Sequence, residues 1–239
     1  MTTISANLQA VRARVSAAAH AAGRDAAAVG LVAVSKTWPA AAVAEAAACG
    51  QRAFGENYAQ EGVQKVRELT GLGLEWHFIG PLQSNKTQLV AEHFDWVHGL
   101  EREKIAARLS AQRPAGLAPL QVCIQVNLGL EAGKSGVAPA DVQALARAVA
   151  KLPGLRLRGL MCIPEATDNT ELLARRFGEL AALRNALNAE GYALDTLSMG
   201  MSQDFELAIA CGATLVRVGS AIFGSRARSP GSAREKDRT

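Results

Sequence analysis

Short apolar runs alternate with longer amphipathic stretches along the chain. The apolar runs have the length of strands and lie near residues 30–36, 52–55, 74–79, 94–98, 118–127, 155–162, 195–199 and 214–218. The stretches between them have helical spacing and cover roughly 39–50, 57–70, 84–92, 101–112, 139–151, 170–190 and 203–211. The spacing is clearest within 170–190, at Leu173, Phe177, Leu180, Leu183 and Leu187. The pattern predicts eight strands joined by seven helices.

A further amphipathic helix is predicted over residues 3–22, before the first strand. Its apolar positions have helical spacing, and Gly23 follows as a stop signal; they are Ile4, Leu8, Val11 and Val15. Because parallel strands need helical crossovers, this element order predicts an α/β fold, a single (β/α)8 TIM barrel. The N-terminal helix then stands in for the eighth helix, since ring closure brings the first strand beside the last. An open doubly wound sheet is the alternative, but no glycine-rich dinucleotide fingerprint follows the first strand.

Length and composition are those of one globular domain. The chain has 239 residues, of which 49% are hydrophobic and 20% charged. No apolar run approaches the roughly eighteen residues that a membrane helix needs, so no membrane partner is expected. The N-terminus lacks the basic start and apolar middle of a secretory signal, and we therefore expect a cytoplasmic protein.

The net charge of +4 is concentrated at the C-terminal end. Residues 225–239 hold five basic and two acidic side chains, which leaves the rest of the chain nearly neutral. We therefore predict a barrel over residues 1–224 and a disordered basic tail over 225–239, and we expect no nucleic-acid partner. The cysteines form no CxxC pair, which favours reduced core residues over metal ligands or disulfides; they are Cys49, Cys123, Cys162 and Cys211.

A lysine follows the first apolar run, in the segment LVAVSKTWP (residues 31–39). In this type of barrel the functional groups come from the C-terminal ends of the strands, where Lys36 is expected. Val32, Val34 and Lys36 share one face of the strand, so the amine projects into the barrel mouth if that face is the lumen. A desolvated amine there attacks carbonyl carbon and forms a Schiff base. The alternative is a lysine that extends into solvent.

The last two strands are followed by segments suited to a phosphate. The chain reads SMGMSQD over residues 198–204 and VRVGSAIFG over 216–224. Glycines such as Gly219 let the backbone approach an anion, Ser202 and Ser220 offer hydroxyls, and a helix that begins near Gln203 offers N–H groups. The alternative makes Ser202 an N-cap and Gly219 an ordinary turn residue. The neighbouring lysine favours a phosphate site.

Six segments together resemble the YggS-like pyridoxal-phosphate homeostasis proteins, whose fold is similar to the barrel domain of bacterial alanine racemase. The resemblance covers nearly the whole chain up to Gly224, and its segments are LVAVSKTWP, AFGENYAQE, WHFIGPLQSNKTQLV, LRGLMCIP, SMGMSQDFELAI and VRVGSAIFG. It implies that Lys36 carries pyridoxal 5′-phosphate (PLP) as a Schiff base, and that Ser202, Gly219 and Ser220 hold the phosphate.

The resemblance implies further cofactor-binding residues. It places Arg217 at the pyridine nitrogen and Asn57, His77 and Met201 at the pocket. A cation at that position opposes protonation of the ring and weakens it as an electron sink, which suits holding the cofactor better than carbanion chemistry. His77 is alternatively a hydrogen-bonded structural residue, and Asn57 alternatively starts the following helix.

These residues predict a PLP carrier or buffer and no catalytic residues. Alanine racemase takes its second base from a tyrosine of a separate β-domain, and Tyr58 and Tyr192 stand in no segment that looks like such a module. The alternatives are a weak PLP-dependent racemase and a cofactor-free Schiff-base aldolase. PLP-dependent apo-enzymes are the expected recipients, and a monomer is expected.

Two further motifs are set aside. The segment GLEAGKS (129–135) has three residues between its glycines where a P-loop needs four, although Lys134 could transiently accept the aldehyde. His93 and His98 lack a third ligand at a metal-like spacing, so no metal site is expected.

Overall fold

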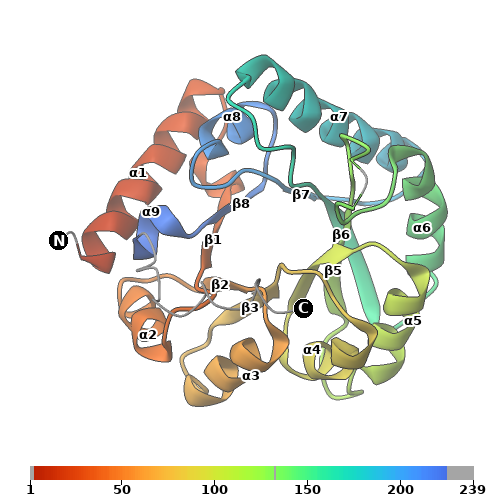
Figure 1. The fold of residues 1–239 in the computed structure, drawn as a ribbon, viewed down its shortest axis with the longest axis horizontal. Helices are drawn as coiled ribbons and strands as arrows, with labels where there is room; N and C mark the ends of the chain where they lie inside the picture. The colour runs from red at the N-terminus through yellow and green to blue at the C-terminus, as the bar shows by residue number, and fades with distance from the viewer. Residues whose placement is uncertain (1–2, 132, 225–239) are drawn as a thin grey trace, which may run out of the picture.

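The strands form a closed barrel of parallel strands. The structure is a computed structural model that describes residues 3–131 and 133–224. Its strands pair in sequence order, and β8 closes the ring on β1 (Figure 1). They are β1 (Gly30–Val34), β2 (Ala53–Glu56), β3 (Glu75–Phe78), β4 (Trp96–Leu100), β5 (Leu120–Gln125), β6 (Leu155–Met161), β7 (Thr196–Ser198) and β8 (Leu215–Val218). Each strand coincides with a predicted apolar run to within two residues, which confirms the (β/α)8 fold.

The helices surround the barrel as the spacing predicts. They are α1 (Ile4–Ala21), α2 (Ala40–Ala48), α3 (Ala59–Glu68), α4 (Thr87–His93), α5 (Glu103–Gln112), α6 (Val142–Val149), α7 (Thr170–Ala189), α8 (Phe205–Ala210) and α9 (Ser220–Phe223), with 3-10 turns η1 (Ala26–Ala28), η2 (Ser84–Lys86) and η3 (Pro139–Asp141). The sequence did not predict α9, because a single turn of four residues is too short to show a period. It also started α8 two residues early.

Helix α1 occupies the place of the eighth helix. The hydroxyl of Thr3 accepts the N–H of Ala6 at 3.2 Å and caps the helix, and the buried face includes Leu8 and Val11. The helix packs against α2 on one side and α8 on the other, which closes the outer ring (Figure 1). The Asn7 side chain donates to the carbonyl of Ile222 at 2.9 Å and ties α1 to α9.

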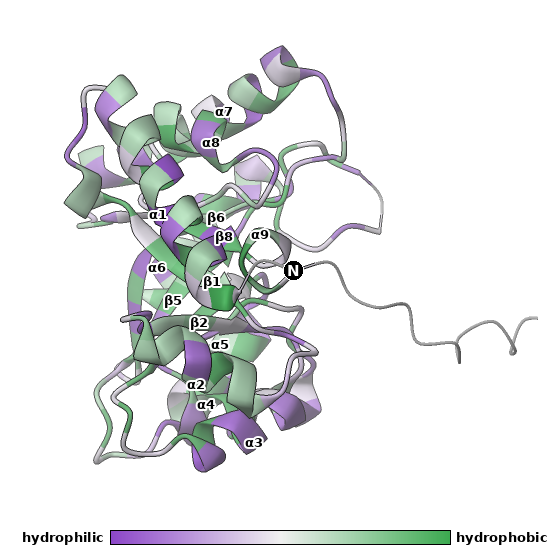
Figure 2. Cartoon of the chain, turned by 90° about the vertical axis from the view of Figure 1, so that its left-hand side faces the viewer, coloured by the Kyte–Doolittle hydropathy of each residue, from purple (hydrophilic) through white to green (hydrophobic). Residues whose placement is uncertain are grey.

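The barrel has two layers of buried side chains. A large apolar core lies between the strands and the helices and includes Phe54, Phe78 and Leu160. Figure 2 shows hydrophobic residues on strands such as β1 and β5, with hydrophilic positions along the outer helices. The lumen is different, because its small apolar cluster of Trp96, Cys123 and Met161 lies among buried polar side chains. The lumen therefore holds the polar groups that lie beneath the mouth of the barrel.

The four cysteines are free thiols, and Cys123 and Cys162 are buried. Burial raises the pKa of each of these two thiols to about 12, which keeps them protonated and unreactive. Within the described ranges, no helix is both long and apolar enough to cross a bilayer. The predicted basic tail, residues 225–239, lies outside the described residues.

Candidate functional site

A cavity of about 520 Å³ opens at the C-terminal ends of the strands. Its wall comes from segments that are far apart in sequence: Val34, Lys36, Trp38, Asn57, Ile79, Ile163, Met201, Ser202, Gln203, Asp204, Arg217, Gly219, Ser220 and Gly224. Every residue that the sequence nominated for the cofactor lines this pocket except His77. The volume lies within the roughly 300–1,000 Å³ that is usual for sites of small ligands.

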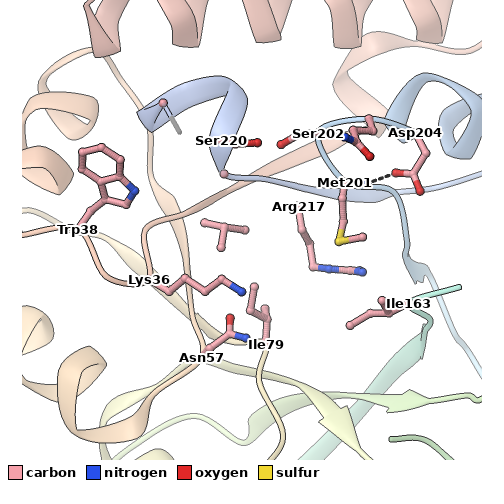
Figure 3. Close-up of a pocket in the computed structure, with 14 residues that line it drawn as sticks. Lys36, Trp38, Asn57, Ile79, Ile163, Met201, Ser202, Asp204, Arg217 and Ser220 are labelled. Atoms are coloured by element: carbon pink, nitrogen blue, oxygen red, sulfur yellow. Dashed lines mark hydrogen bonds between the residues drawn. The ribbon is translucent and has the colours of Figure 1, made fainter. Parts of the chain in front are cut away.

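Lys36 lies on one side of the pocket, in the turn that follows β1. Val32 and Val34 point toward the lumen as the alternation predicts, and the half-buried Lys36 continues along that face. The register that pairs Val34 with Gly55 brings the two following segments together, so Lys36 and Asn57 share one wall. Figure 3 shows the amine directed into the pocket beside Asn57 and Ile79.

Asn57 is a pocket residue and does not cap the next helix. The N-cap position of α3 is Tyr58, which makes no capping hydrogen bond with its side chain. The Oδ1 atom of Asn57 is buried and has no hydrogen-bond partner in the structure. A buried acceptor without a donor is costly, so a ligand with a hydroxyl or an N–H group would satisfy this atom.

The opposite side is formed by two turns, after β7 and after β8. Gly200 has φ +91, and Met201 donates its N–H to Asp204 Oδ1 at 2.6 Å, which fixes the first turn. The hydroxyls of Ser202 and Ser220 face one another on this side (Figure 3). Neither serine is an N-cap of α8, because that position is occupied by Asp204.

Gly219 lets the two strands approach closely at this wall. A Cβ atom at this position would lie 3.2 Å from the carbonyl oxygen of Val34 on β1, which is tighter than most real contacts. The glycine therefore keeps the backbone of the β8 turn against β1 and leaves the pocket side without a side chain. This arrangement is a cradle that suits an anion held between two hydroxyls.

Arg217 forms the floor of the pocket and is almost completely buried, with 3% of its surface exposed. Its Nη1 donates to the Ser198 hydroxyl at 2.6 Å, and its Nη2 donates to the carbonyl of Cys162 at 2.9 Å. Burial lowers the pKa of this guanidinium from its usual value, but the group remains a cation because arginine starts so high. The pocket floor therefore carries a fixed positive charge.

His77 lies below the pocket, in the lumen. Its Nδ1 is 2.9 Å from His98 Nε2, and His98 Nδ1 is 2.7 Å from the Ser198 hydroxyl that Arg217 contacts. The ring of His77 also stacks on Trp96, with ring centroids 5.4 Å apart. Of the two roles considered for His77, the structure thus favours the hydrogen-bonded structural one.

Ser198, His98 and His77 form a hydrogen-bonded column that ends at Arg217. Because a guanidinium can only donate, Ser198 accepts from Arg217, and its own proton is then available to His98 Nδ1. We predict this arrangement, in which His98 carries its proton on Nε2 and donates to His77 Nδ1. The proton of His77 then lies on Nε2, a buried nitrogen without a hydrogen-bond partner in the structure, 3.6 Å from Glu75 Oε1.

Both histidines in the column are neutral. Burial lowers the pKa of His77 to about 3. Burial lowers the pKa of His98 well below its usual value, and the electrostatic influence of His77 and of the Arg217 cation adds to this effect. The column is therefore an ordered set of neutral donors and acceptors that ends at the arginine.

Several pocket residues were not found from the sequence. Trp38 stacks on Phe223 with ring centroids 5.9 Å apart and closes one side, and Asp204 holds the turn after β7. Both lie in segments that carry the family resemblance, which was the available signal. Ile79 and Ile163 also lie in such segments, but their pattern gave no further signal, because an apolar pocket residue has the same pattern as a core residue.

Lys134 lies outside the residues that line the pocket. Its amine pairs with Glu131 Oε1 at 2.6 Å in the loop after β5, and the lysine is exposed. Transient acceptance of an aldehyde by Lys134 stays a prediction.

Comparison with known proteins shows the general class of barrel to which the chain belongs. A family model described as alanine racemase, N-terminal domain, matches residues 6–227. Alanine racemase from Corynebacterium glutamicum has the same fold at a TM-score of 0.66 and 19% identity, over 95% of this chain and 63% of that one. The fold and the lysine at its mouth thus define a barrel of the alanine racemase N-terminal type.

Closer relatives are much more similar. Proteins named pyridoxal phosphate homeostasis protein include one from Pseudomonas aeruginosa, 61% identical over 226 residues, which are 95% of this chain and 97% of the relative. One from Escherichia coli K12 is 54% identical over 229 residues, 95% and 98% of the two chains. PipY of Synechococcus elongatus, solved with PLP bound, has a TM-score of 0.82 and 37% identity, over 93% of this chain and all of that one. The chain belongs to the family of pyridoxal phosphate homeostasis proteins.

Proposed function

We propose that this protein binds pyridoxal 5′-phosphate through a Schiff base on Lys36 and acts in PLP homeostasis as a carrier or buffer of the cofactor. One observation carries the proposal: the Lys36 amine and the Ser202–Ser220 hydroxyl pair lie on opposite sides of one pocket (Figure 3). The names of the curated relatives and the PLP bound to PipY support it. Action in the cytoplasm, as a monomer, and delivery to PLP-dependent apo-enzymes belong to the same proposal.

The residues present fit this cofactor. A flat aromatic ring suits apolar walls such as Val34, Ile79 and Ile163, and a ring hydroxyl suits the unpartnered Oδ1 of Asn57. An anionic phosphate suits the cradle of Ser202, Gly219 and Ser220 described above. Bound PLP supplies an aldehyde for attachment to amines and a ring that withdraws electrons from an attached amino acid.

The chain's own residues would hold and shield this reactive group. Lys36 would hold the aldehyde carbon through a C=N bond, with the aldehyde oxygen lost as water. Arg217 presents a fixed cation at the pocket floor, held by Ser198 and Cys162, and donates hydrogen bonds only. With the ring nitrogen bound at this cation, Arg217 would disfavour protonation of the nitrogen and so limit electron withdrawal, which suits storage of the cofactor.

The pocket also bears on the racemase alternative. Racemisation needs acid and base groups on both faces of the substrate carbon. In the part of the chain that the structure describes, the pocket wall includes no tyrosine, and its carboxylate, Asp204, already accepts the N–H of Met201. Tyr58 is exposed, and Tyr192 packs against the outer core. The residues at hand therefore favour binding over turnover.

Absorbance and reduction test the proposal. The purified protein with PLP is expected to be yellow and to bleach with borohydride, leaving the added mass on Lys36. Lys36→Ala is expected to lose this product and keep its fold, while Lys104→Ala, on the outer helix α5, serves as the control. Reduced mass on another lysine would contradict the site, and a colourless protein that traps a phosphorylated sugar on Lys36 would favour the aldolase.

Turnover separates the carrier from the racemase. The loaded protein is incubated with single enantiomers of amino acids, and loss of optical purity is followed by chiral chromatography. A carrier is expected to show no conversion at enzyme-like rates. Release of cofactor from Lys134→Ala, compared with the unmodified chain, tests whether that lysine takes part in transfer.

A further inference from the structure

The turn that carries Lys36 has a strained backbone. Trp38 donates its N–H to the carbonyl of Ser35 at 3.0 Å, which makes Ser35–Trp38 a four-residue turn with Lys36 at its second position. Thr37, at the third position, has φ +68. This left-handed conformation favours glycine or asparagine, and a β-branched residue adopts it only where other contacts hold it.

Those contacts come from helix α3. Glu61 Oε1 accepts the N–H of Thr37 at 2.5 Å, and the Lys65 amine donates to the carbonyl of Ser35 at 2.8 Å. The two side chains therefore hold the turn on both sides of Lys36. The same Ser35 carbonyl also accepts the hydrogen bond that closes the turn.

Lys65 itself is part of a buried cluster of charges. Its side chain is 5% exposed, and its amine lies 2.7 Å from Glu56 Oε1 and 2.7 Å from Glu61 Oε1. Together with the Ser35 carbonyl these are three acceptors, so the amine needs all three protons of an ammonium. Glu56 is fully buried at the end of β2 and also accepts the Ser35 hydroxyl at 2.6 Å.

The proposed function assigns no role to this cluster. Burying charges is costly, so the cluster calls for an explanation. A buried ion pair adds less to stability than its charges suggest, and its best-attested use is to specify one arrangement. Here the three charged residues of the cluster contact Ser35 and Thr37, and none of the three lines the pocket. Their contacts therefore act on the two residues that flank the reactive lysine.

We propose that Glu61 and Lys65 are positioning residues that hold Thr37 in the left-handed conformation and thereby aim the Lys36 amine into the pocket. This inference rests on the proposed function, because it assumes that Lys36 is the attachment point. Without the two side chains, Thr37 relaxes to an ordinary conformation and the turn changes the direction in which Lys36 leaves the strand. Bond formation at Lys36 then becomes slower, while the barrel persists.

The test uses Glu61→Ala as the main variant, because Glu61 lies at the outer side of the cluster with 29% of its side chain exposed. The matched control is Glu68→Ala, an exposed glutamate of the same helix that pairs with Gln64. Lys65→Met is a second variant, with unfolding checked by circular dichroism, because it leaves Glu56 buried without its partner.

Two measurements are made on each variant. The first is hydrogen exchange of the Thr37 amide, by NMR, in protein without PLP. The second is the rate at which PLP becomes trapped on Lys36 in the presence of cyanoborohydride, by mass mapping. In Glu61→Ala the exchange rate of the Thr37 amide is expected to rise about tenfold or more, and the rate of PLP trapping on Lys36 to fall by a similar factor. These changes correspond to the loss of a charge-assisted hydrogen bond. Glu68→Ala is expected to match the unmodified chain.

A rescue distinguishes positioning from general stability. Glycine adopts φ near +68 without strain, so Thr37→Gly added to Glu61→Ala is expected to restore most of the trapping rate. Glu61→Gln keeps the acceptor oxygen, so this variant is also expected to retain most of the trapping rate.

The outcomes separate the two proposals. If the unmodified chain traps no PLP on Lys36, the proposed function fails, and exchange at Thr37 still reports on the turn. Unchanged exchange and trapping in Glu61→Ala would overturn the positioning role, as would a folded Thr37→Gly, Glu61→Ala double variant without recovery.

Discussion

Replacing Ser198 by alanine removes one oxygen atom from the lumen, and that atom joins two halves of the polar column. The hydroxyl is fully buried, accepts from Arg217 Nη1 at 2.6 Å and forms a hydrogen bond of 2.7 Å with His98 Nδ1, to which we expect it to donate. Alanine leaves a guanidinium donor and a ring nitrogen without these partners. The loss of one hydroxyl therefore disturbs two buried groups.

The magnitude follows from these two groups. A buried polar group left without its partner costs about 1–3 kcal/mol, so with two such groups Ser198→Ala is expected to lower the free energy of unfolding by roughly 2–6 kcal/mol. For a chain of this size each kcal/mol corresponds to about 2–4 °C in Tm. Arg217 keeps its second bond, to the Cys162 carbonyl, so the expected loss is less than that of an isolated buried charge.

Urea denaturation at pH 7, followed by circular dichroism, measures the change. The matched control is Ser135→Ala, an exposed serine, which is expected to stay within about 0.5 kcal/mol of the unmodified chain. Nitrogen-15 NMR of the unmodified chain gives an independent reading, with His77 and His98 both expected to carry the proton on Nε2. A Ser198→Ala stability equal to that of the control, or a proton on Nδ1 of either histidine, would refute the ordered column.

Three further predictions concern pH, the turn after β7 and the phosphate cradle. Because burial holds the pKa of His77 at about 3 and that of His98 well below 6.5, proton NMR is expected to show neither ring titrating between pH 8 and 5. Both folded values lie below the unfolded one, so only the unfolded chain takes up these protons, and each histidine weakens folding by about 1.4 kcal/mol per pH unit below about 6.5. Gly200→Ala is expected to unfold more easily by at least the roughly 1–3 kcal/mol of a strained left-handed residue, because its Cβ would also lie 2.6 Å from that of Ala208. Gly71→Ala is the control, because Gly71 has φ +92 and open space around it, so this variant measures the cost of the backbone conformation alone. Equal losses of unfolding free energy in the two variants would show that the contact with Ala208 adds nothing. Ser202→Ala and Ser220→Ala are each expected to release PLP about 2- to 13-fold more readily in dialysis, as for one neutral hydrogen bond, and unchanged release in both would move the phosphate elsewhere.

The sequence determined the fold because the barrel is built from local, repeated signals. Each strand is a short apolar run, and helical spacing separates the runs, most clearly within residues 3–22 and 170–190. Ring closure then required an eighth outer helix, and the N-terminal segment had the right pattern to supply it. Lys36 could be placed at the mouth for the same reason, because strand parity and the end of the run are both local features.

Only the tertiary structure decided which polar groups meet. By strand alternation, His77 lies on the face of β3 that points into the lumen. Its ring nevertheless forms a hydrogen bond with His98 and does not line the pocket, because the depth of a side chain in the lumen depends on the stagger between strands. The contact of Lys65 with the Ser35 carbonyl joins residues 30 positions apart, and no local pattern distinguishes this lysine from one whose amine is solvated. Periodicity indicates the face of a strand or helix on which a side chain lies. Hydrogen bonds across a barrel also depend on the register between strands, which is defined only when the ring is closed.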